Sequence, residues 1–132
     1  MTGADRSGDR NLTGVWSGLY TYPDGRSTSF VATLIDSGGA LSGTTHEPGA
    51  GGATLYAGLA GSRRDAAVAF TKIYERPDRD HRQPIDYQGA LNGDGTEIEG
   101  RWTILSVWSG KFLMIRSAGS DATVSQKKFE RA

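Results

Sequence analysis

The sequence contains no cysteine, no long apolar run and no excess of either charge. Without cysteine, disulfides, cysteine-ligated zinc, iron–sulfur clusters and thiol nucleophiles are excluded. Fifteen Lys and Arg residues balance fifteen Asp and Glu residues, which argues against a nucleic-acid or anionic-membrane partner. No apolar run approaches the roughly 20 residues that span a bilayer, and the first residues lack the apolar core of a signal peptide. We therefore expect a cytoplasmic protein without a metal or cofactor.

Glycine and β-forming residues dominate what remains. The chain has 132 residues and 19 glycines, and that length suits a single domain. Short runs rich in β-branched and aromatic residues alternate with turn signals. These runs cover residues 13–22, 27–36, 40–47, 54–62, 66–74, 85–92, 96–104 and 108–117. They predict an all-β fold, an eight-stranded antiparallel up-and-down β-barrel over 12–117. Residues 1–11 are expected to form a disordered N-terminal arm, and 118–132 a polar C-terminal tail.

The connections between the runs differ in length at the two ends of the expected barrel. If strands alternate up and down, every long connection falls at one end, which carries residues 22–26, 48–53, 75–84 and 105–107. The other end carries only short turns, at 37–39, 63–64 and 93–95. This asymmetry is typical of a cup, closed at one end and able to admit a ligand at the other.

Alternation within the runs assigns side chains to the two faces of the barrel. Residues 97–104 alternate most clearly, so Trp102 is expected to point inward. A unit of glycine, one residue and a large apolar residue recurs, as in Gly100 to Trp102 and Gly110 to Phe112. The glycine leaves a gap and the large residue fills it, as a tightly coiled small barrel requires.

The chain resembles the calycin superfamily, which includes lipocalins, fatty-acid-binding proteins and avidins. The resemblance rests on Gly-Val-Trp ending at Trp16 and on Arg116 in the last run. It implies a barrel whose closed end holds the tryptophan with the arginine packed over it. The opening Leu-Thr-Gly-Val-Trp and the segment 39–44 are similar to avidins in particular. The avidin biotin ligands do not carry over, because Gly18 and Phe70 stand near two of their positions.

Aromatic residues near the expected open end are the candidate ligand contacts. Tyrosine and tryptophan combine apolar area with a hydrogen-bonding tip, which suits a partly polar small molecule. The candidates are Tyr20, Tyr22, Phe70, Tyr87, Trp102 and Phe112. The other polar residues that alternation allows inside are Thr28, Thr45, Glu47, Lys72, Tyr74 and Arg116. We expect Arg116 to stack on Trp16, a structural role.

Non-catalytic binding of a small ligand is the leading hypothesis for function, and two alternatives stay open. The first is an enzyme that uses Glu47 and a tyrosine for proton transfer in the same cup. The second is a filled barrel that acts only as a protein–protein interaction module. A metal site at His46 and His81 is disfavoured, because the two histidines face no common point.

An outward apolar patch suggests a homodimer or higher homo-oligomer. Its members lie on three strands that closure makes neighbours, the first, second and eighth. They are Val15, Leu19, Val31, Ile35, Leu113 and Ile115.

Overall fold

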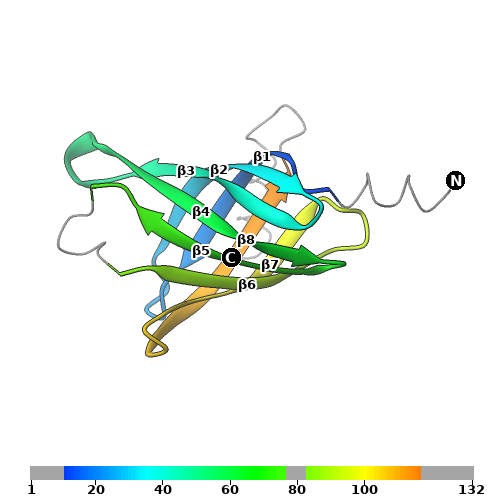
Figure 1. Ribbon diagram of the computed structural model, residues 1–132. Helices are drawn as coiled ribbons and strands as arrows, with labels where there is room; N and C mark the ends of the chain where they lie inside the picture. The colour runs from blue at the N-terminus through cyan, green and yellow to red at the C-terminus, as the bar shows by residue number, and fades with distance from the viewer. Residues whose placement is uncertain (1–10, 77–82, 117–132) are drawn as a thin grey trace, which may run out of the picture.

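The computed structural model describes residues 11–76 and 83–116, and these form a closed antiparallel β-barrel (Figure 1). Each strand pairs with the next along the chain, and the last pairs with the first. The strands are β1 (Gly14–Thr21), β2 (Ser27–Ser37), β3 (Ala40–Pro48), β4 (Thr54–Arg64), β5 (Ala67–Tyr74), β6 (Ile85–Leu91), β7 (Glu97–Ile104) and β8 (Trp108–Arg116). A short 3-10 helix, η1 (Ala50–Gly52), lies between β3 and β4. The prediction of an all-β, eight-stranded up-and-down barrel is confirmed.

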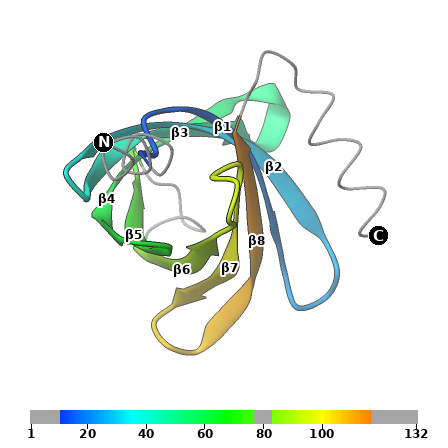
Figure 2. The same ribbon diagram turned by 90° about the vertical axis from the view of Figure 1, so that its right-hand side faces the viewer.

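Two of the strand pairings stop before the strands reach the open end of the barrel. The pairing of β2 with β3 ends at Val31 and His46, although β2 continues beside β1 and β3 continues beside β4. The pairing of β5 with β6 likewise ends at Lys72 and Ile85. The β1–β2 and β7–β8 hairpins extend away from the rest of the barrel (Figure 2). The wall of the barrel is therefore split between β2 and β3 near its open end.

Large inward side chains fill the middle of the barrel. Phe70 and Tyr87 stack with ring centroids 4.8 Å apart, and Phe112 meets Tyr87 edge-on at 4.9 Å. All three are at most 4% exposed. Apolar residues from every strand surround this aromatic core, and burying them supplies the main driving force for folding.

Two glycines make room for rings of a neighbouring strand, and for Gly110 this ring is not the expected one of Phe112. A Cβ on Gly110 would lie 2.5 Å from Nε1 of Trp102, which belongs to β7. A Cβ on Gly18 would fall within 2.5 Å of three ring atoms of Phe30, which belongs to β2. The sequence unit paired Gly110 with a residue of its own strand. In a coiled barrel the neighbouring strand supplies the filler, because paired residues on one face lie closer than residues two positions apart.

Arg116 and Trp16 seal the closed end, as predicted. The guanidinium carbon of Arg116 lies 4.6 Å from the ring centroid of Trp16. Arg116 also donates hydrogen bonds to the carbonyl oxygens of Gly95, Thr13 and Asn11. Trp16 Nε1 donates to the carbonyl oxygen of Leu12 at 2.9 Å. The last strand is thereby tied to the chain that enters the first.

Asp36 makes a second set of contacts at the closed end. Its carboxylate accepts hydrogen bonds from the backbone N–H groups of Leu12 and Gly39 and from Nε of Arg63, at 3.0, 2.9 and 2.6 Å. The Asp36 side chain is fully buried. These contacts hold the segment that precedes β1 against the β2–β3 turn.

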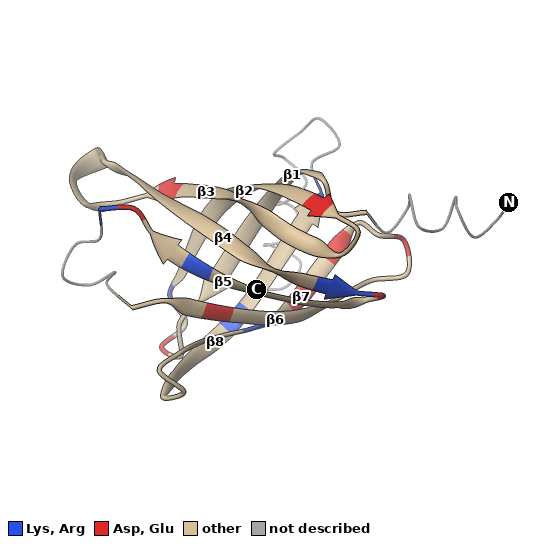
Figure 3. Cartoon of the chain, in the orientation of Figure 1, with Lys and Arg blue, Asp and Glu red and all other residues tan. Residues whose placement is uncertain are grey.

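Two members of the predicted outward apolar patch are buried. Val15 and Ile35 are 44% and 53% exposed, but Leu113 and Ile115 are buried at 7% and 5% although they face outward. The patch is therefore not one continuous exposed surface. Acidic and basic positions are interspersed along the strands and turns (Figure 3).

Three expectations fall on residues outside the described ranges. They concern residues 1–10 of the expected arm, His81 with part of the connection 75–84, and the expected tail 118–132. Within the described ranges, no helix has the length and apolar character needed to cross a membrane.

Candidate functional site

A buried polar cluster lies just inside the open end of the barrel. Glu47 is one residue from the end of β3, and its carboxylate is in reach of side chains from β1 and β5. Its Oε1 accepts hydrogen bonds from Lys72 Nζ at 2.7 Å and from the Tyr74 hydroxyl at 2.8 Å. Its Oε2 accepts a hydrogen bond from the Tyr20 hydroxyl. Both side chains of the Glu47–Lys72 ion pair are only 1% exposed.

Aromatic rings surround the ammonium group of Lys72. Its Nζ lies 4.7, 5.0, 5.2 and 5.8 Å from four ring centroids, in that order those of Tyr74, Tyr20, Phe30 and Tyr87. Distances below about 6 Å place a cation within the attraction of a ring's π face. We refer to these four rings together with the Glu47 carboxylate as the cation cage. The protein's own lysine occupies it.

Burial shifts the protonation equilibria in the cage. Desolvation lowers the pKa of Lys72, and the opposite charge and hydrogen bond of Glu47 counteract only part of that effect. Burial also raises the pKa of Tyr20 and of Tyr74 far above the usual range, and the neighbouring Glu47 adds to both shifts. Both tyrosines therefore keep their protons at neutral pH and act as hydrogen-bond donors.

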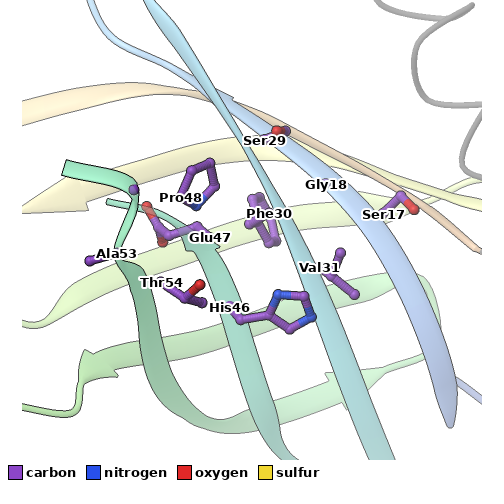
Figure 4. A pocket seen from close by; sticks show the side chains of 11 residues that line it. Ser17, Gly18, Ser29, Phe30, Val31, His46, Glu47, Pro48, Ala53 and Thr54 are labelled. Atoms are coloured by element: carbon purple, nitrogen blue, oxygen red, sulfur yellow. The ribbon is translucent and has the colours of Figure 1, made fainter. Parts of the chain in front are cut away.

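A cleft of about 430 Å³ opens where β2 and β3 separate, and Figure 4 shows its lining. The segment between β3 and β4, with the first residue of β4, borders it on one side, and residues of β1, β2 and β3 border it on the other. The lining residues are Ser17, Gly18, Ser29, Phe30, Val31, His46, Glu47, Pro48, Gly52, Ala53 and Thr54. Phe30 and Glu47 belong to both the cleft and the cation cage. A second hollow of about 740 Å³ lies over the outer faces of β1, β7 and β8 and shares no residue with the cage.

The six predicted ligand contacts divide into two groups. Phe70, Tyr87 and Phe112 form the aromatic core in the middle of the barrel. Tyr20, Tyr22 and Trp102 form an edge-to-face series at the open end, with centroid separations of 5.6 and 5.8 Å. None of the six lines the cleft between β2 and β3. Whether they contact a ligand stays a prediction.

Sequence reasoning named Glu47 and Lys72 among the inward polar residues but did not pair them. Lys72 lies in phase with Val68, Phe70 and Tyr74 on β5, so alternation placed it inside an apolar row. The partner could not be read from the sequence because β4 lies between β3 and β5. His46, the other residue considered for a metal, faces outward on β3 and lines the cleft. Within the described part of the chain, no three His, Asp or Glu side chains gather to hold a metal ion.

Comparison with known proteins identifies the architecture. No family model matches the chain, and no curated protein matches it in sequence. Among solved structures, a redesigned β-barrel has a TM-score of 0.63 and 17% identity over 80% of this chain and 91% of its own. A de novo designed fluorescence-activating β-barrel has a TM-score of 0.60 and 12% identity over 83% of this chain and 96% of its own. At these identities the likeness establishes the eight-stranded barrel fold and nothing about a ligand.

Proposed function

We propose that the protein binds a small, partly apolar molecule at the open end of its barrel, without transforming it. The observation that carries the proposal is the cleft between β2 and β3, whose inner residues Phe30 and Glu47 also belong to the cation cage. Its volume of about 430 Å³ falls within the range of small-molecule sites, about 300–1,000 Å³. The cleft provides apolar walls with a few convergent polar groups, as such sites do.

The free energy required to bury the Glu47–Lys72 ion pair supports a role of this pair in ligand recognition. A buried ion pair is often no more stabilising than apolar side chains of the same size, because both charges lose their hydration. The barrel nevertheless places Glu47 and Lys72 in its interior, beside the one end where its wall is split. Strongly perturbed titratable groups next to a cleft are typical of functional sites.

Binding is favoured over catalysis by the state of the tyrosines. Proton transfer near neutral pH needs a group whose pKa lies close to that pH. Burial raises the pKa of Tyr20 and of Tyr74, which moves both values further from neutral pH. Their hydroxyl groups are therefore suited to orienting the Glu47 carboxylate.

A relationship to calycins is the second part of the proposal. The stacking of Arg116 on Trp16 at the closed end supports it, since the resemblance drawn from the sequence implies that arrangement. The small ligand of the proposal is not biotin, because the avidin contacts do not carry over to Gly18 and Phe70.

The filled interior favours the interaction module as a second candidate function. The aromatic core occupies the middle of the barrel, and Val107 and Trp108 at the β7–β8 hairpin are 78% and 62% exposed. Exposed apolar groups on a projecting hairpin are a common feature of interaction sites. Under this candidate, no small molecule would bind between β2 and β3.

A chemical-shift titration with a library of small molecules distinguishes the two candidates. We expect hits to move the amide signals of Val31, His46 and Thr54, which line the cleft. Ser29→Tyr should fill the cleft and abolish binding, whereas Ser42→Tyr should leave it unchanged. Both serines are exposed on strands, but only Ser29 lines the cleft. Hits that bind the Ser29→Tyr variant as well as the wild type would refute the proposed site.

A further inference from the structure

The cleft and the cation cage share two walls. Glu47 lines the cleft and also accepts the hydrogen bond from Lys72 Nζ at 2.7 Å. Phe30 lines the cleft, and its ring centroid lies 5.2 Å from the same nitrogen. Both residues are almost fully buried, at 3% and 4% exposure, so they lie between the cleft and the cage that holds the lysine.

We infer that the ligand of this site is an organic cation whose ammonium group takes the place of the Lys72 ammonium in the cage. The inference rests on the proposed binding function and names the ligand class. Four aromatic rings and one carboxylate around a nitrogen are the arrangement that stabilises an alkylammonium group. In this barrel the lysine side chain acts as an internal competitor for the site.

The charge of the cleft favours a cation over an anion. Glu47 is the one acidic residue among those that line the cleft, and none of them is Lys or Arg. An anionic ligand would have to approach the Glu47 carboxylate before it reached Lys72. Lys72 neutralises Glu47 while it occupies the cage, but once the lysine has left, the carboxylate attracts a cation and repels carboxylates and phosphates.

Thr45 offers a further polar contact beyond the carboxylate. It lies on the same inward face of β3 as Glu47, two residues farther from the open end, and is 2% exposed. Within the described residues its hydroxyl has no hydrogen-bond partner. Its ladder neighbours, Ala32 and Ala57, are small. Thr45 does not line the cleft, so a polar ligand group would satisfy this hydroxyl only by passing beyond Glu47 into the interior.

Lys72 is placed so that it can leave the cage. It lies two residues before the end of β5, and its pairing with Ile85 is the last rung between β5 and β6 toward the open end. A lysine has a flexible four-carbon stem that can carry its ammonium group to water while the stem stays against apolar surface. In the inferred exchange the Lys72 side chain, which is 1% exposed in the cage, swings its ammonium group toward the open end.

The test compares probes of one shape and different charge by calorimetry and chemical-shift titration. Choline is the cation, 3,3-dimethyl-1-butanol is its neutral isostere, and 4,4-dimethylpentanoate is the anion. We expect choline to bind the wild-type protein at least tenfold more tightly than either of the others. Lys72→Met removes the internal competitor and should strengthen choline binding a further tenfold or more. Equal or tighter binding of the isostere or the anion would overturn the inference.

A second pair of variants keeps the test decisive if Lys72→Met does not fold. Phe30→Leu removes the ring that the cleft and the cage share, and should weaken choline binding at least fivefold with little effect on the isostere. Leu34→Ala is the control for lost core packing, because Leu34 is buried on the same strand as Phe30 and belongs to neither the cleft nor the cage. Equal effects of the two substitutions on choline would contradict the inference. Neutral compounds that bind at a site blocked by Ser29→Tyr would refute the cationic ligand and leave the proposed function standing.

Discussion

At the scale of single residues, the buried pair of Glu47 and Lys72 is the most consequential feature of this barrel. Each partner is almost completely removed from water, so each depends on the other and on the tyrosine hydroxyls for its stabilisation. Removal of one partner leaves an uncompensated charge in an apolar interior. Removal of both leaves a space that apolar side chains can fill.

A double-mutant cycle tests this dependence. Glu47→Leu should lower the free energy of unfolding by about 3–5 kcal/mol, because the Lys72 ammonium loses its counter-charge. The double variant Glu47→Leu/Lys72→Met should recover most of that loss, because no buried charge remains. Urea unfolding followed by circular dichroism measures both. A double variant that is less stable than Glu47→Leu would contradict the argument.

The Asp36 carboxylate predicts how stability depends on pH. Burial alone would raise its pKa, but the hydrogen bonds and charge of Arg63 and the N–H groups of Leu12 and Gly39 outweigh burial and lower the pKa. A lowered pKa in the folded state means that the contribution is complete above the unfolded-state value of about 3.9. It is lost as the pH falls through the lower folded-state value.

Asp36→Asn should therefore flatten the decline of stability with acidification below about pH 4, where the unfolded-state pKa of Asp lies. Urea unfolding at a series of pH values measures the slope. Asp94→Asn, on an exposed turn, is the control and should change the free energy of unfolding at neutral pH by no more than about 0.5 kcal/mol. An unchanged acid slope in Asp36→Asn would show that Asp36 does not contribute as described.

At the scale of elements, the close approach of neighbouring strands determines where glycine is required. A Cβ on Gly100 of β7 would lie 1.9 Å from the carbonyl oxygen of Gln88 and 2.5 Å from Cα of Gly89, both on β6. No flexible side chain is available to move aside, so the backbones of the two strands would have to separate. Gly58 of β4 has no atom within 4 Å of the same position.

Alanine substitutions at these two glycines should have opposite effects. Gly100→Ala should destabilise the barrel by about 3 kcal/mol or more, the upper part of the range for overpacking. Gly58→Ala should be neutral or stabilise by up to about 1 kcal/mol, because alanine reduces the entropy of the unfolded chain. Thermal unfolding of both variants provides the measurement. Similar losses in both would mean that glycine is needed for reasons other than close strand contact.

The strands themselves were readily predicted, because period-two alternation and turn residues are local signals. The expected run 40–47 differs by one residue from β3 (Ala40–Pro48), and the expected run 85–92 differs by one residue from β6 (Ile85–Leu91). The split between β2 and β3 was not predicted. It depends on where the ladder ends at Val31 and His46, which is set by how both strands curve around the core.

At the scale of the whole molecule, closure between β1 and β8 makes the barrel one cooperative unit. The two strands pair from Trp16 and Arg116 to Tyr20 and Phe112. Arg116 extends this closure with hydrogen bonds to Gly95 and to the segment that enters β1. The ends of the described chain are thereby held together at the closed end.

Arg116→Met should therefore destabilise the whole barrel. We expect a loss of about 2–4 kcal/mol, from the charged hydrogen bonds and the contact with Trp16. Urea unfolding should remain a single transition when followed by tryptophan fluorescence and by circular dichroism. Arg101→Met, on an exposed outward position of β7, is the control and should cost less than about 0.5 kcal/mol. Equal losses in both variants would contradict the role of Arg116 in closure.

The sequence by itself determined the strands, their inward faces and the ends at which the connections lie, because hydrophobic alternation and turn chemistry act over a few residues. It also allowed Glu47, Lys72 and Tyr74 to be inside the barrel. Only the tertiary structure decided that these three meet Tyr20 in one cluster. The physical reason is register: residues on β1, β3 and β5 are brought together by the closure and coiling of the whole barrel, and no local pattern encodes that.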